Sequence, residues 1–404
     1  MIEFTDKGLF CPAGGFYIDP WKPVERAVIT HAHSDHARPG SRAYLCHRLT
    51  VPLLALRLGS GGAGGAGGAG IAGGAGVAGS AGVAGGAGVA GGAGVAGGEA
   101  PVYQGVEWGE VVDMNGVRVS LHPAGHIIGS SQVRMEYQGR VWVVSGDYKT
   151  EDDGLSGAFE PVRCDVFITE STFGLPIYHW KPQEAIFGSI REWVLENKGL
   201  EKTSVLIAYS LGKAQRLLKC LEPLGVKIYV HGAIWNVHQA LVNAGVVLPP
   251  VERVTPEMPK EVYRGQVVIA PSSAEDSPWM RRFQPYSVGV CSGWMQVRGN
   301  VRRRNADAGF VLSDHADWKG LLEAVKGTGA KQVYVTHGFQ AALSRYLNEN
   351  GVSAAEVKTQ FGEDEEGGAL SVEEGGAVGV EEGGAASVEE GGAASVEEGA
   401  ADGK

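Results

Sequence analysis

The 404-residue sequence has little cysteine, and none of it forms a recognisable pair. The five cysteines are scattered along the chain and odd in number, and they form no CxxC motif: Cys11, Cys46, Cys164, Cys220 and Cys291. This pattern argues against a disulfide framework and favours a reducing compartment. The first ten residues also lack the apolar run of a signal peptide, so we expect a cytoplasmic location.

A convincing membrane span is lacking as well. The one long uncharged segment, 59–98, contains 21 glycines, and its larger side chains recur every six residues. Gly and Ala contribute little apolar area, and each Gly costs about 1 kcal/mol in a helix relative to Ala. We therefore expect a low-complexity surface insertion and no contact with a membrane.

Positive charge is scarce overall, with a formal net charge of −11, but the deficit is local. Of the 46 acidic and 35 basic residues, 13 and one respectively lie beyond Gln360, which leaves 33 and 34 in the rest. The tail, 361–404, repeats an acidic VEEGGA unit and has the composition of a disordered segment. The nearly neutral body is compatible with a nucleic-acid substrate.

Polar clusters follow several short β-branched runs that we predict to be strands. The predicted strands are Arg26–Thr30, Val117–Leu121, Arg140–Ser145 and Val333–Thr336. His31, His33, Asp35 and His36 follow the first strand, and His126, Asp147 and His337 follow the others. Residues just past strand ends can converge on one rim of a sheet, so we expect these seven to meet.

The clearest indication of a metal site is the cluster His31-Ala32-His33-Ser34-Asp35-His36. Imidazole and carboxylate groups are ligands that zinc prefers. In an extended segment His31 and His33 point to the same side, whereas Asp35 and His36 point apart and can serve a second ion. His126, Asp147 and His337 are each weak signals alone. Together the seven predict two incomplete ligand shells, with Asp147 able to bridge two ions that activate a water and clamp a phosphate.

At this point the sequence resembles the metallo-β-lactamase superfamily and, within it, the β-CASP nucleases. Glu170 in ITEST and His315 in SDHAD match residues of that group, as does the final His337-Gly338. More narrowly, five segments resemble bacterial ligase-associated DNA exonucleases: HAHSDHARPG (31–40), PAGHIIGSSQV (123–133), VSGDYKT (144–150), RCDVFITESTFGLPIY (163–178) and GFVLSDHADW (309–318).

The resemblance implies an α/β protein with a four-layer αββα metallo-β-lactamase fold and an inserted β-CASP α/β domain. The expected divisions are 1–172 (with the insertion 59–98), 173–305 for the β-CASP domain, 306–360 for the returning part, and the tail 361–404. Apolar runs independently predict a parallel sheet with helices on its faces. These runs are Val205–Ser210, Val226–Val230, Gln266–Ala270 and Ser287–Cys291, with predicted helices at Gly212–Leu221 and Leu45–Leu58.

The same resemblance assigns roles to individual residues. It implies that His31, His33 and His126 hold one ion, that Asp35, His36 and His337 hold the other, and that Asp147 bridges them. The ions would be zinc, with manganese or magnesium as alternatives. Asp35 would help to orient or deprotonate the attacking water. His315 would be the general acid, a role that suits an imidazole, and Glu170 would orient it.

Substrate contacts are predicted from two further patterns. Ser210, Gly212 and Lys213 lie between a predicted strand and a predicted helix, where backbone N–H groups and a lysine can receive a phosphate. The same pattern also suits a plain strand-to-helix turn. Arg298 and Arg302–Arg304 precede the SDHAD segment and would bring positive charge to a DNA backbone, although arginine runs often form solvated surfaces.

We weigh four functions against these observations, in decreasing order of support. The first is a DNA exonuclease in repair that acts with an ATP-dependent DNA ligase and a helicase, as the resemblance implies. The second is an RNA-processing nuclease, because no residue reads the sugar. The third, a thioesterase or lactamase, does not explain the long interval from Asp147 to His337. The fourth, a non-catalytic scaffold, does not explain a full set of ligands.

Overall fold

Three β-sheets organise the part of the chain that the computed structural model describes, which is residues 1–59, 100–297, 299 and 306–359. Most of the predicted insertion 59–98 and the predicted acidic tail 361–404 lie outside the described residues. The mixed α/β class predicted from the sequence is confirmed.

The first sheet contains the six N-terminal strands in chain order. They are β1 (Glu3–Thr5), β2 (Gly8–Cys11), β3 (Phe16–Ile18), β4 (Arg26–Val28), β5 (Ala43–His47) and β6 (Val102–Val106). The first three pair antiparallel and the last four pair parallel. The predicted strand before the histidine cluster is therefore confirmed as β4.

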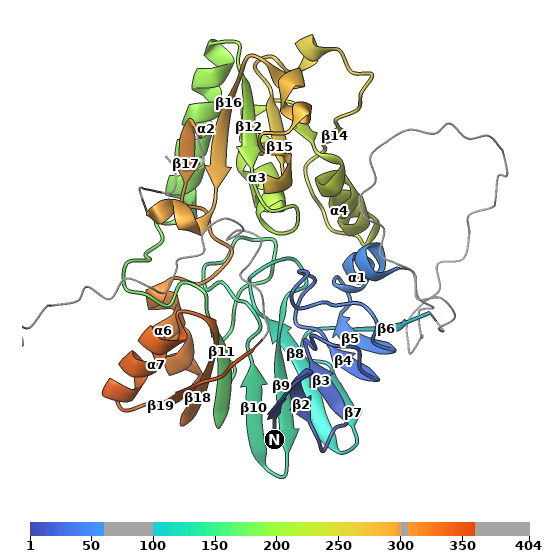
Figure 1. The fold of residues 1–404 in the computed structure, drawn as a ribbon, viewed down its shortest axis with the longest axis vertical. Helices are drawn as coiled ribbons and strands as arrows, with labels where there is room; N and C mark the ends of the chain where they lie inside the picture. Colours follow the sequence, from blue (N-terminus) through green and yellow to red (C-terminus); the bar gives the residue numbers. More distant parts are fainter. Residues whose placement is uncertain (60–99, 298, 300–305, 360–404) are drawn as a thin grey trace, which may run out of the picture. The chain divides into compact units, whose positions relative to one another are not determined.

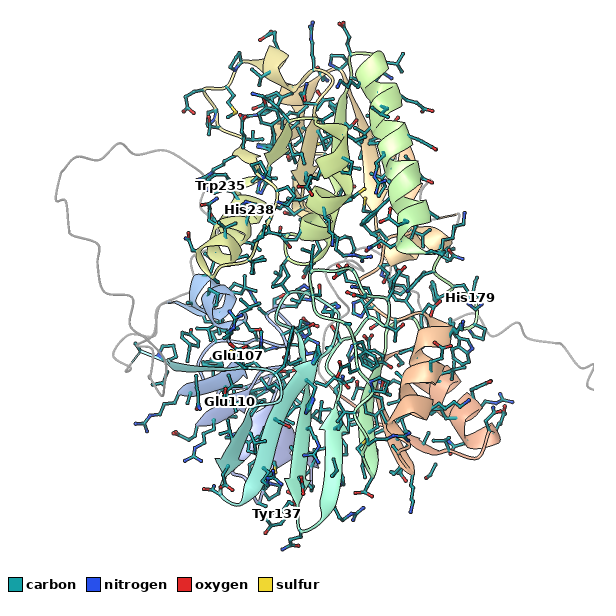
Figure 2. All side chains as sticks on the ribbon, turned by 180° about the vertical axis from the view of Figure 1, so that it is seen from behind. Glu107, Glu110, Tyr137, His179, Trp235 and His238 are labelled. Carbon is teal, nitrogen blue, oxygen red and sulfur yellow. The ribbon has the colours of Figure 1, made fainter. Side chains whose placement is uncertain are left out.

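The second sheet combines central and C-terminal segments of the chain. Its order is β19 (Ser353–Glu356), β18 (Gln332–Gly338), β11 (Val166–Ser171), β10 (Arg140–Val144), β9 (Ser131–Tyr137), β8 (Val117–Pro123) and β7 (Val111–Met114). Two-residue turns with positive φ join β7 to β8 and β9 to β10: Asn115-Gly116 (φ 54° and 85°) and, after Tyr137 (Figure 2), Gln138-Gly139 (φ 50° and 74°). Such turns match the twist of paired strands.

The first two sheets pack face to face, and helices cover their outer faces. Side chains of both sheets, such as Leu45 and Val133, share one buried core. Outside the first sheet, α1 (Val51–Leu58) buries Leu53 and Leu54. Outside the second sheet lie α6 (Trp318–Thr328) and α7 (Gln340–Glu349), beside β11, β18 and β19 (Figure 1).

The third sheet is parallel throughout its described strands. Its order is β14 (Glu252–Arg253), β13 (Ile228–Val230), β15 (Val267–Ala270), β12 (Thr203–Ile207), β16 (Tyr286–Cys291) and β17 (Ala308–Phe310). The associated helices are α2 (Gln183–Gly199), α3 (Lys213–Leu221) and α4 (Gly232–Asn243). Leu206 packs into one core and Val205 and Ile207 into another, so both faces of the sheet are buried. The predicted parallel sheet is confirmed.

Short 3-10 helices complete the described elements: η1 (Glu222–Leu224), η2 (Lys260–Tyr263), η3 (Ser272–Ala274), η4 (Pro278–Phe283) and η5 (Gly293–Gln296). One predicted helix, Leu45–Leu58, is wrong in its first half. Leu45, Cys46 and His47 belong to β5, which is held between β4 and β6, and the helix begins only at Val51. Pro52 lies in its first turn, where proline is well tolerated.

All five cysteines are free thiols. Among the described residues, no helix combines the length and apolar character needed to cross a membrane.

Candidate metal centre

The seven predicted ligands come together where strands of the two facing sheets end. The loop after β4 carries His31, His33, Asp35 and His36; His126 follows β8, Asp147 follows β10, and His337 lies near the end of β18. His31, His36, His126 and Asp147 are each at most 1% exposed. Their ligand atoms fall into overlapping groups within 4.8 Å, chief among them His31, His33, His126 and Asp147, and then His36, Asp147 and His337.

The contact between His33 and His126 indicates that a cation belongs here. Nε2 of His33 donates to the carbonyl oxygen of Leu211 (3.1 Å), and Nδ1 of His126 donates to that of Asp314 (2.8 Å). Because carbonyl oxygens only accept, each ring has one further nitrogen that takes no part in these two bonds. These nitrogens face each other at 3.0 Å. Two ring nitrogens this close must share a cation, which is either a proton or a metal ion.

Asp19 fixes the tautomers of two further imidazoles, although it is not among the residues predicted from the sequence. Its carboxylate accepts from Nδ1 of His36 (2.8 Å) and from the backbone N–H and hydroxyl of Thr30 (2.8 and 2.5 Å). Since the Thr30 hydroxyl donates to Asp19, it accepts from Nδ1 of His31 (3.0 Å). Nε2 of both rings is thus turned toward Asp147, as expected for carboxylate-oriented metal ligands. The signal that could have revealed Asp19 is its position directly after the strand Phe16–Ile18.

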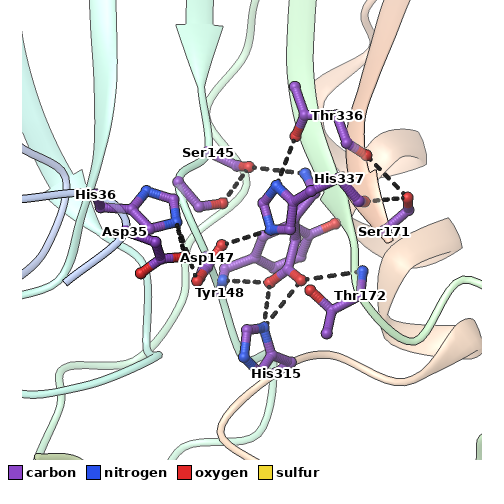
Figure 3. Close-up of polar contacts among 12 residues, drawn as sticks. Asp35, His36, Ser145, Asp147, Tyr148, Ser171, Thr172, His315, Thr336 and His337 are labelled. Carbon is purple, nitrogen blue, oxygen red and sulfur yellow. Dashed lines mark hydrogen bonds and ion pairs between the residues drawn. The ribbon is translucent and has the colours of Figure 1, made fainter. Parts of the chain in front are cut away.

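Asp147 is the centre of this group. Its Oδ2 lies 3.4 Å from Nε2 of His36, and its Oδ1 lies 3.0 Å from Nε2 of His337 (Figure 3). The same Oδ2 lies 3.4 Å from Nε2 of His31 and 3.8 Å from Nε2 of His126. His337 in turn donates its Nδ1 proton to the Thr336 hydroxyl (3.2 Å), whose own proton goes to Thr169 O.

The donor set fits a borderline divalent cation. Ligand atoms of a tetrahedral zinc with Zn–N bonds of about 2.0–2.1 Å stand about 3.3 Å apart, and the contacts between these nitrogen and oxygen atoms span 3.0–3.8 Å. Four of the five rings present Nε2 and His33 presents Nδ1, while each opposite nitrogen is held by an oxygen. The residues present are therefore able to hold metal ions, and the assignment of each as a ligand stays a prediction.

Electrostatics divides the histidines into two kinds. Burial, together with the nearby His36, holds the pKa of His31 well below 6.5, and burial with His315 and His33 lowers that of His126 to about 3. Burial also opposes a charge on His36 and His337, but the Asp147 carboxylate outweighs it and raises both pKa values, that of His36 with help from Asp35. Despite burial, His36 and His337 hold the pKa of Asp147 well below 3.8. Asp147 is therefore a carboxylate that requires positive charge beside it.

His315 and Glu170 form a pair next to this group. Nδ1 of His315 donates to the Glu170 carboxylate, with contacts of 3.1 and 2.9 Å, and the backbone N–H groups of Tyr148 and Thr172 donate to the same carboxylate at 2.7 and 3.3 Å (Figure 3). The rings of His315 and His126 lie 4.6 Å apart. Both predicted residues thus lie beside the candidate metal ligands, with the imidazole oriented by a fixed carboxylate.

A cavity of about 240 Å³ opens beside His33. Its walls come from the turns that follow β12 and β15, including Tyr209, Ser210 and Ser272, together with Ser34 and Arg57 from the first sheet and its helix. Crevices at the carboxyl ends of parallel strands are common ligand sites. This cavity therefore extends the metal centre toward the third sheet.

The predicted substrate-binding residues are placed differently from one another. Ser210 lines the cavity, whereas Gly212 is buried with φ of 98°, and a Cβ there would lie 2.4 Å from Ile127. Lys213 is 0% exposed, and its Nζ lies 3.6 Å from Asp314. Its side chain is therefore not the surface group that the predicted phosphate contact requires, because it lies in the interior beside a carboxylate. Arg298 and Arg302–Arg304 lie outside the described residues.

The chain is similar in sequence to proteins whose names refer to enzymes or factors that act on nucleic acids. It is 27% identical over 355 residues to a probable DNA ligase of Opitutus terrae, covering 87% of this chain and 30% of the relative. Over shorter stretches it matches the cleavage and polyadenylation specificity factor subunit 3 of Dictyostelium discoideum (33% over 120 residues, 29% of this chain and 15% of the relative). It likewise matches the endoribonuclease ysh-1 of Neurospora crassa (31% over 127 residues, 30% and 14%). The chain thus spans less than a third of the length of these relatives.

A solved structure shares the fold at low identity. A protein of unknown function from Enterococcus faecalis V583 superposes with a TM-score of 0.51 and 11% identity, covering 82% of this chain and 78% of the other. No protein-family model matches the chain. The homologues confirm the resemblance to the metallo-β-lactamase superfamily and its β-CASP nucleases.

Proposed function

We propose that the chain is a two-metal, zinc-dependent phosphodiesterase that degrades DNA, and that it acts as an exonuclease in repair. The observation that carries this proposal is the convergence of five oriented imidazoles on Asp147, beside the His315–Glu170 pair. In this proposal the two facing sheets with their outer helices are the four-layer metallo-β-lactamase fold. The third sheet and its helices are the inserted β-CASP domain, at about 173–305.

The ions, when bound, would supply Lewis-acid chemistry, which lowers the pKa of a water and neutralises charge on the scissile phosphate. The chain would hold them through His31, His33 and His126 on one side and through Asp35, His36 and His337 on the other, with Asp147 shared. Asp35 is partly exposed at the edge of this group, with its Oδ2 3.4 Å from Nε2 of His36. In this position it would orient the attacking water and accept its proton.

The leaving oxygen needs a proton as the bond between it and phosphorus breaks. His315 is suited to supply one, because Glu170 holds Nδ1 and thereby aims the other edge of the ring. The Glu170 carboxylate is in turn fixed by two backbone N–H groups, so the imidazole has little freedom to turn away. The pair would therefore act as a general acid and its orienting base, and Glu170 would stabilise the imidazolium form.

The cavity beside His33 is the proposed seat of the nucleotide next to the scissile bond. Its hydroxyl groups at Ser34, Ser210 and Ser272 can hydrogen-bond a sugar or a phosphate, and Tyr209 offers an aromatic face. Positive charge from Arg298 and Arg302 remains part of this proposal, as predicted from the sequence. The Lys213 side chain would need to leave its buried position to contact a phosphate.

DNA is favoured over RNA by the relative that covers most of the chain, which is named as a probable DNA ligase. We therefore also propose an ATP-dependent DNA ligase and a helicase as partners. The relatives named as endoribonucleases and polyadenylation factors support RNA as the second candidate substrate.

The test uses zinc-loaded protein with 5′- and 3′-labelled single-stranded DNA and the matching RNA. The control is the Asp35→Ala/His36→Ala variant. Stepwise shortening of DNA, lost in the control, is the expected result and gives the polarity. Cleavage of RNA alone would replace the first candidate by the second. Cleavage of neither polymer by protein that binds two ions would overturn the proposed activity.

A further inference from the structure

A cluster of five charged side chains is buried between the metal centre and the third sheet. Lys149, Asp153, Lys213, Arg216 and Asp314 are each at most 3% exposed. Arg216 Nη1 lies 2.6 Å from Asp314 Oδ1, and Lys149 Nζ lies 2.7 Å from Asp153 Oδ2. Charged groups are rarely buried so fully unless they are paired, and a buried ion pair is weak evidence for stability. Any role of the cluster beyond its own pairing therefore depends on the groups that it contacts.

The cluster holds the loops that carry the first group of candidate ligands. Lys149 Nζ donates to Gly125 O (2.7 Å), the residue before His126, and Arg216 Nη1 donates to Ser313 O (2.5 Å). Asp314, between these contacts, accepts the Nδ1 proton of His126 on its own carbonyl. The backbone before His126 and the Nδ1 edge of its ring are thus each held by a charged member of the cluster.

Helix α3 connects the cluster to the other histidine of this group. Arg216 lies in its first turn, and Leu211, just before the helix, accepts the Nε2 proton of His33. Gly212, between them, approaches so closely that a Cβ would lie 3.1 Å from Asp314 Oδ2. The position of α3 therefore decides where the carbonyl groups for both His33 and His126 lie.

We propose that Arg216 and Asp314 are positioning residues that set the metal affinity of the group His31, His33, His126 and Asp147, and the placement of His315. A displaced α3 would release the tautomers of His33 and His126, so the ion would meet rings that are free to turn. His315 follows Asp314 directly, so the same ion pair also locates the general acid. This inference deepens the proposed function, but its metal-binding part is independent of the substrate.

Arginine suits this position for a geometric reason. Its Nε and Nη2 both donate to Gln183 Oε1 (3.1 and 2.8 Å), while Nη1 serves Ser313 O and Asp314. A lysine would carry the charge but could not maintain this planar fork. The Arg216→Lys variant should therefore retain part of the effect.

The experiment measures zinc affinity by competition with a chromophoric chelator in Arg216→Gln, Arg216→Lys and Asp314→Asn. We expect one of the two ions to bind 10- to 100-fold more weakly in Arg216→Gln and Asp314→Asn, which is the range seen when groups that orient ligands are removed. Arg216→Lys should fall between these variants and the unmodified protein. The second ion, identified by its loss in His337→Asn, should keep its affinity within about twofold. The visible spectrum of the cobalt-loaded protein should change for the first ion only.

Arg191→Gln is the matched control. Arg191 also contacts α3, through Cys220 O (2.9 Å), and pairs with Glu184, but it touches no ligand loop. Equal weakening of zinc in this control would mean that general packing of α3 is responsible and would overturn the proposal. Unchanged zinc affinity in Arg216→Gln would do the same. If Arg216→Gln does not fold, zinc affinity is measured in the Arg216→Gln/Asp314→Asn double variant, which removes both charges. The same selective weakening of one ion is expected there.

Kinetics separates this inference from the proposed function. With a cleaved DNA or RNA, Arg216→Gln at saturating zinc should lower kcat and leave KM nearly unchanged, because His315 is displaced. A protein that cleaves neither polymer yet shows the selective loss of zinc affinity would retain this inference and refute the nuclease. Equal losses in kcat and in substrate binding would overturn the placement of His315.

Discussion

Asp19 orients two of the predicted metal ligands, although it is not itself a predicted ligand. Its two oxygens receive hydrogen bonds from His36 and Thr30, and through Thr30 they control His31. The Asp19→Asn variant keeps the volume but replaces one acceptor by a donor. We expect its zinc affinity to fall 10- to 100-fold, measured by chelator competition.

The control for this prediction is Asp6→Asn, which removes an exposed carboxylate that pairs with the exposed Lys22. It should bind zinc like the unmodified protein. Equal affinities for Asp19→Asn and the unmodified protein would refute the orienting role of Asp19.

Protonation of the same group makes zinc binding depend on pH. The raised pKa values of His36 and His337 favour a second proton on these rings when the site holds no ion, whereas the lowered values of His31 and His126 disfavour one. Zinc must displace those protons, so its affinity should fall as the pH drops below the raised pKa values and level off above them.

Proton release on adding zinc at pH 7, followed with an indicator dye in weak buffer, measures this effect directly. The His36→Asn variant should release fewer protons. Binding of zinc without any release at pH 7 would contradict the assigned protonation.

At the residue level, the sequence located groups that have a local signature and missed those without one. The segment from His31 to His36 contains three histidines and an aspartate, which is enough to indicate a metal site from the sequence alone. Asp147 and His337 follow apolar runs that are recognisable as strands. Asp19 is a single carboxylate before a proline, and only the parallel pairing of β3 with β4 brings it to Thr30. Arg216 meets Asp314 across 98 positions, a pairing that no local pattern encodes.

At the element scale, a substitution in the turn after β10 would show how closely the facing sheets pack around Asp147. Gly146 has φ of 56°, and a Cβ there would lie 2.6 Å from Thr30 Cβ. Gly139, in the turn before β10, has φ of 74° with open space around it. Each glycine-to-alanine change should cost about 1–2 kcal/mol for the left-handed backbone, whereas the clash at Gly146 should add about 1–3 kcal/mol.

Urea unfolding of the metal-free proteins measures these costs. Gly146→Ala should also lose zinc, because it moves both Asp147 and Thr30, whereas Gly139→Ala should keep it. Similar stability and zinc content in the two variants would show that the turn tolerates a side chain.

Elements with a clear apolar pattern were predicted within a few residues. The apolar runs predicted as strands are confirmed as β12, β13, β15 and β16. They were recognisable because a strand that is buried on both faces consists mostly of apolar residues. The segment Leu45–Leu58 was misjudged because an apolar stretch alone does not distinguish a buried strand from a helix. Its first residues pair with two neighbouring strands, which local propensity does not reveal.

At the scale of the whole molecule, the segment 61–97 can be deleted as a test of what the site requires. Its two flanks are already joined, since the hydroxyl of Tyr103 in β6 donates to Gly59 O after α1 (2.9 Å). No predicted ligand lies within it. We expect the deleted protein to bind two zinc ions and to retain its nuclease activity, measured by metal analysis and by the labelled-DNA assay. A loss of zinc would refute this expectation.

The wider architecture was predicted from motifs and from the alternation of strands and helices. The resemblance implied a four-layer fold with an inserted α/β domain, which remains a prediction. The apolar runs independently predicted a parallel sheet, and that sheet is present. The contacts that join the third sheet to the metal loops were not foreseen, because they consist of backbone carbonyls at Leu211 and Asp314. Every residue has such a carbonyl, so its identity carries no signal in the sequence.

These two carbonyl contacts have a consequence for the order in which the protein matures. During synthesis the cluster His31–His36 emerges first, whereas Leu211, Asp314 and His337 follow only after most of the described chain. Contacts between such distant segments close late, because closing a long loop costs entropy before any contact offsets it. An early ion would find a flexible chelating peptide and not an organised site. Stable metal uptake should therefore be among the last steps of folding, and a tightly held ion would mark a chain that has closed completely.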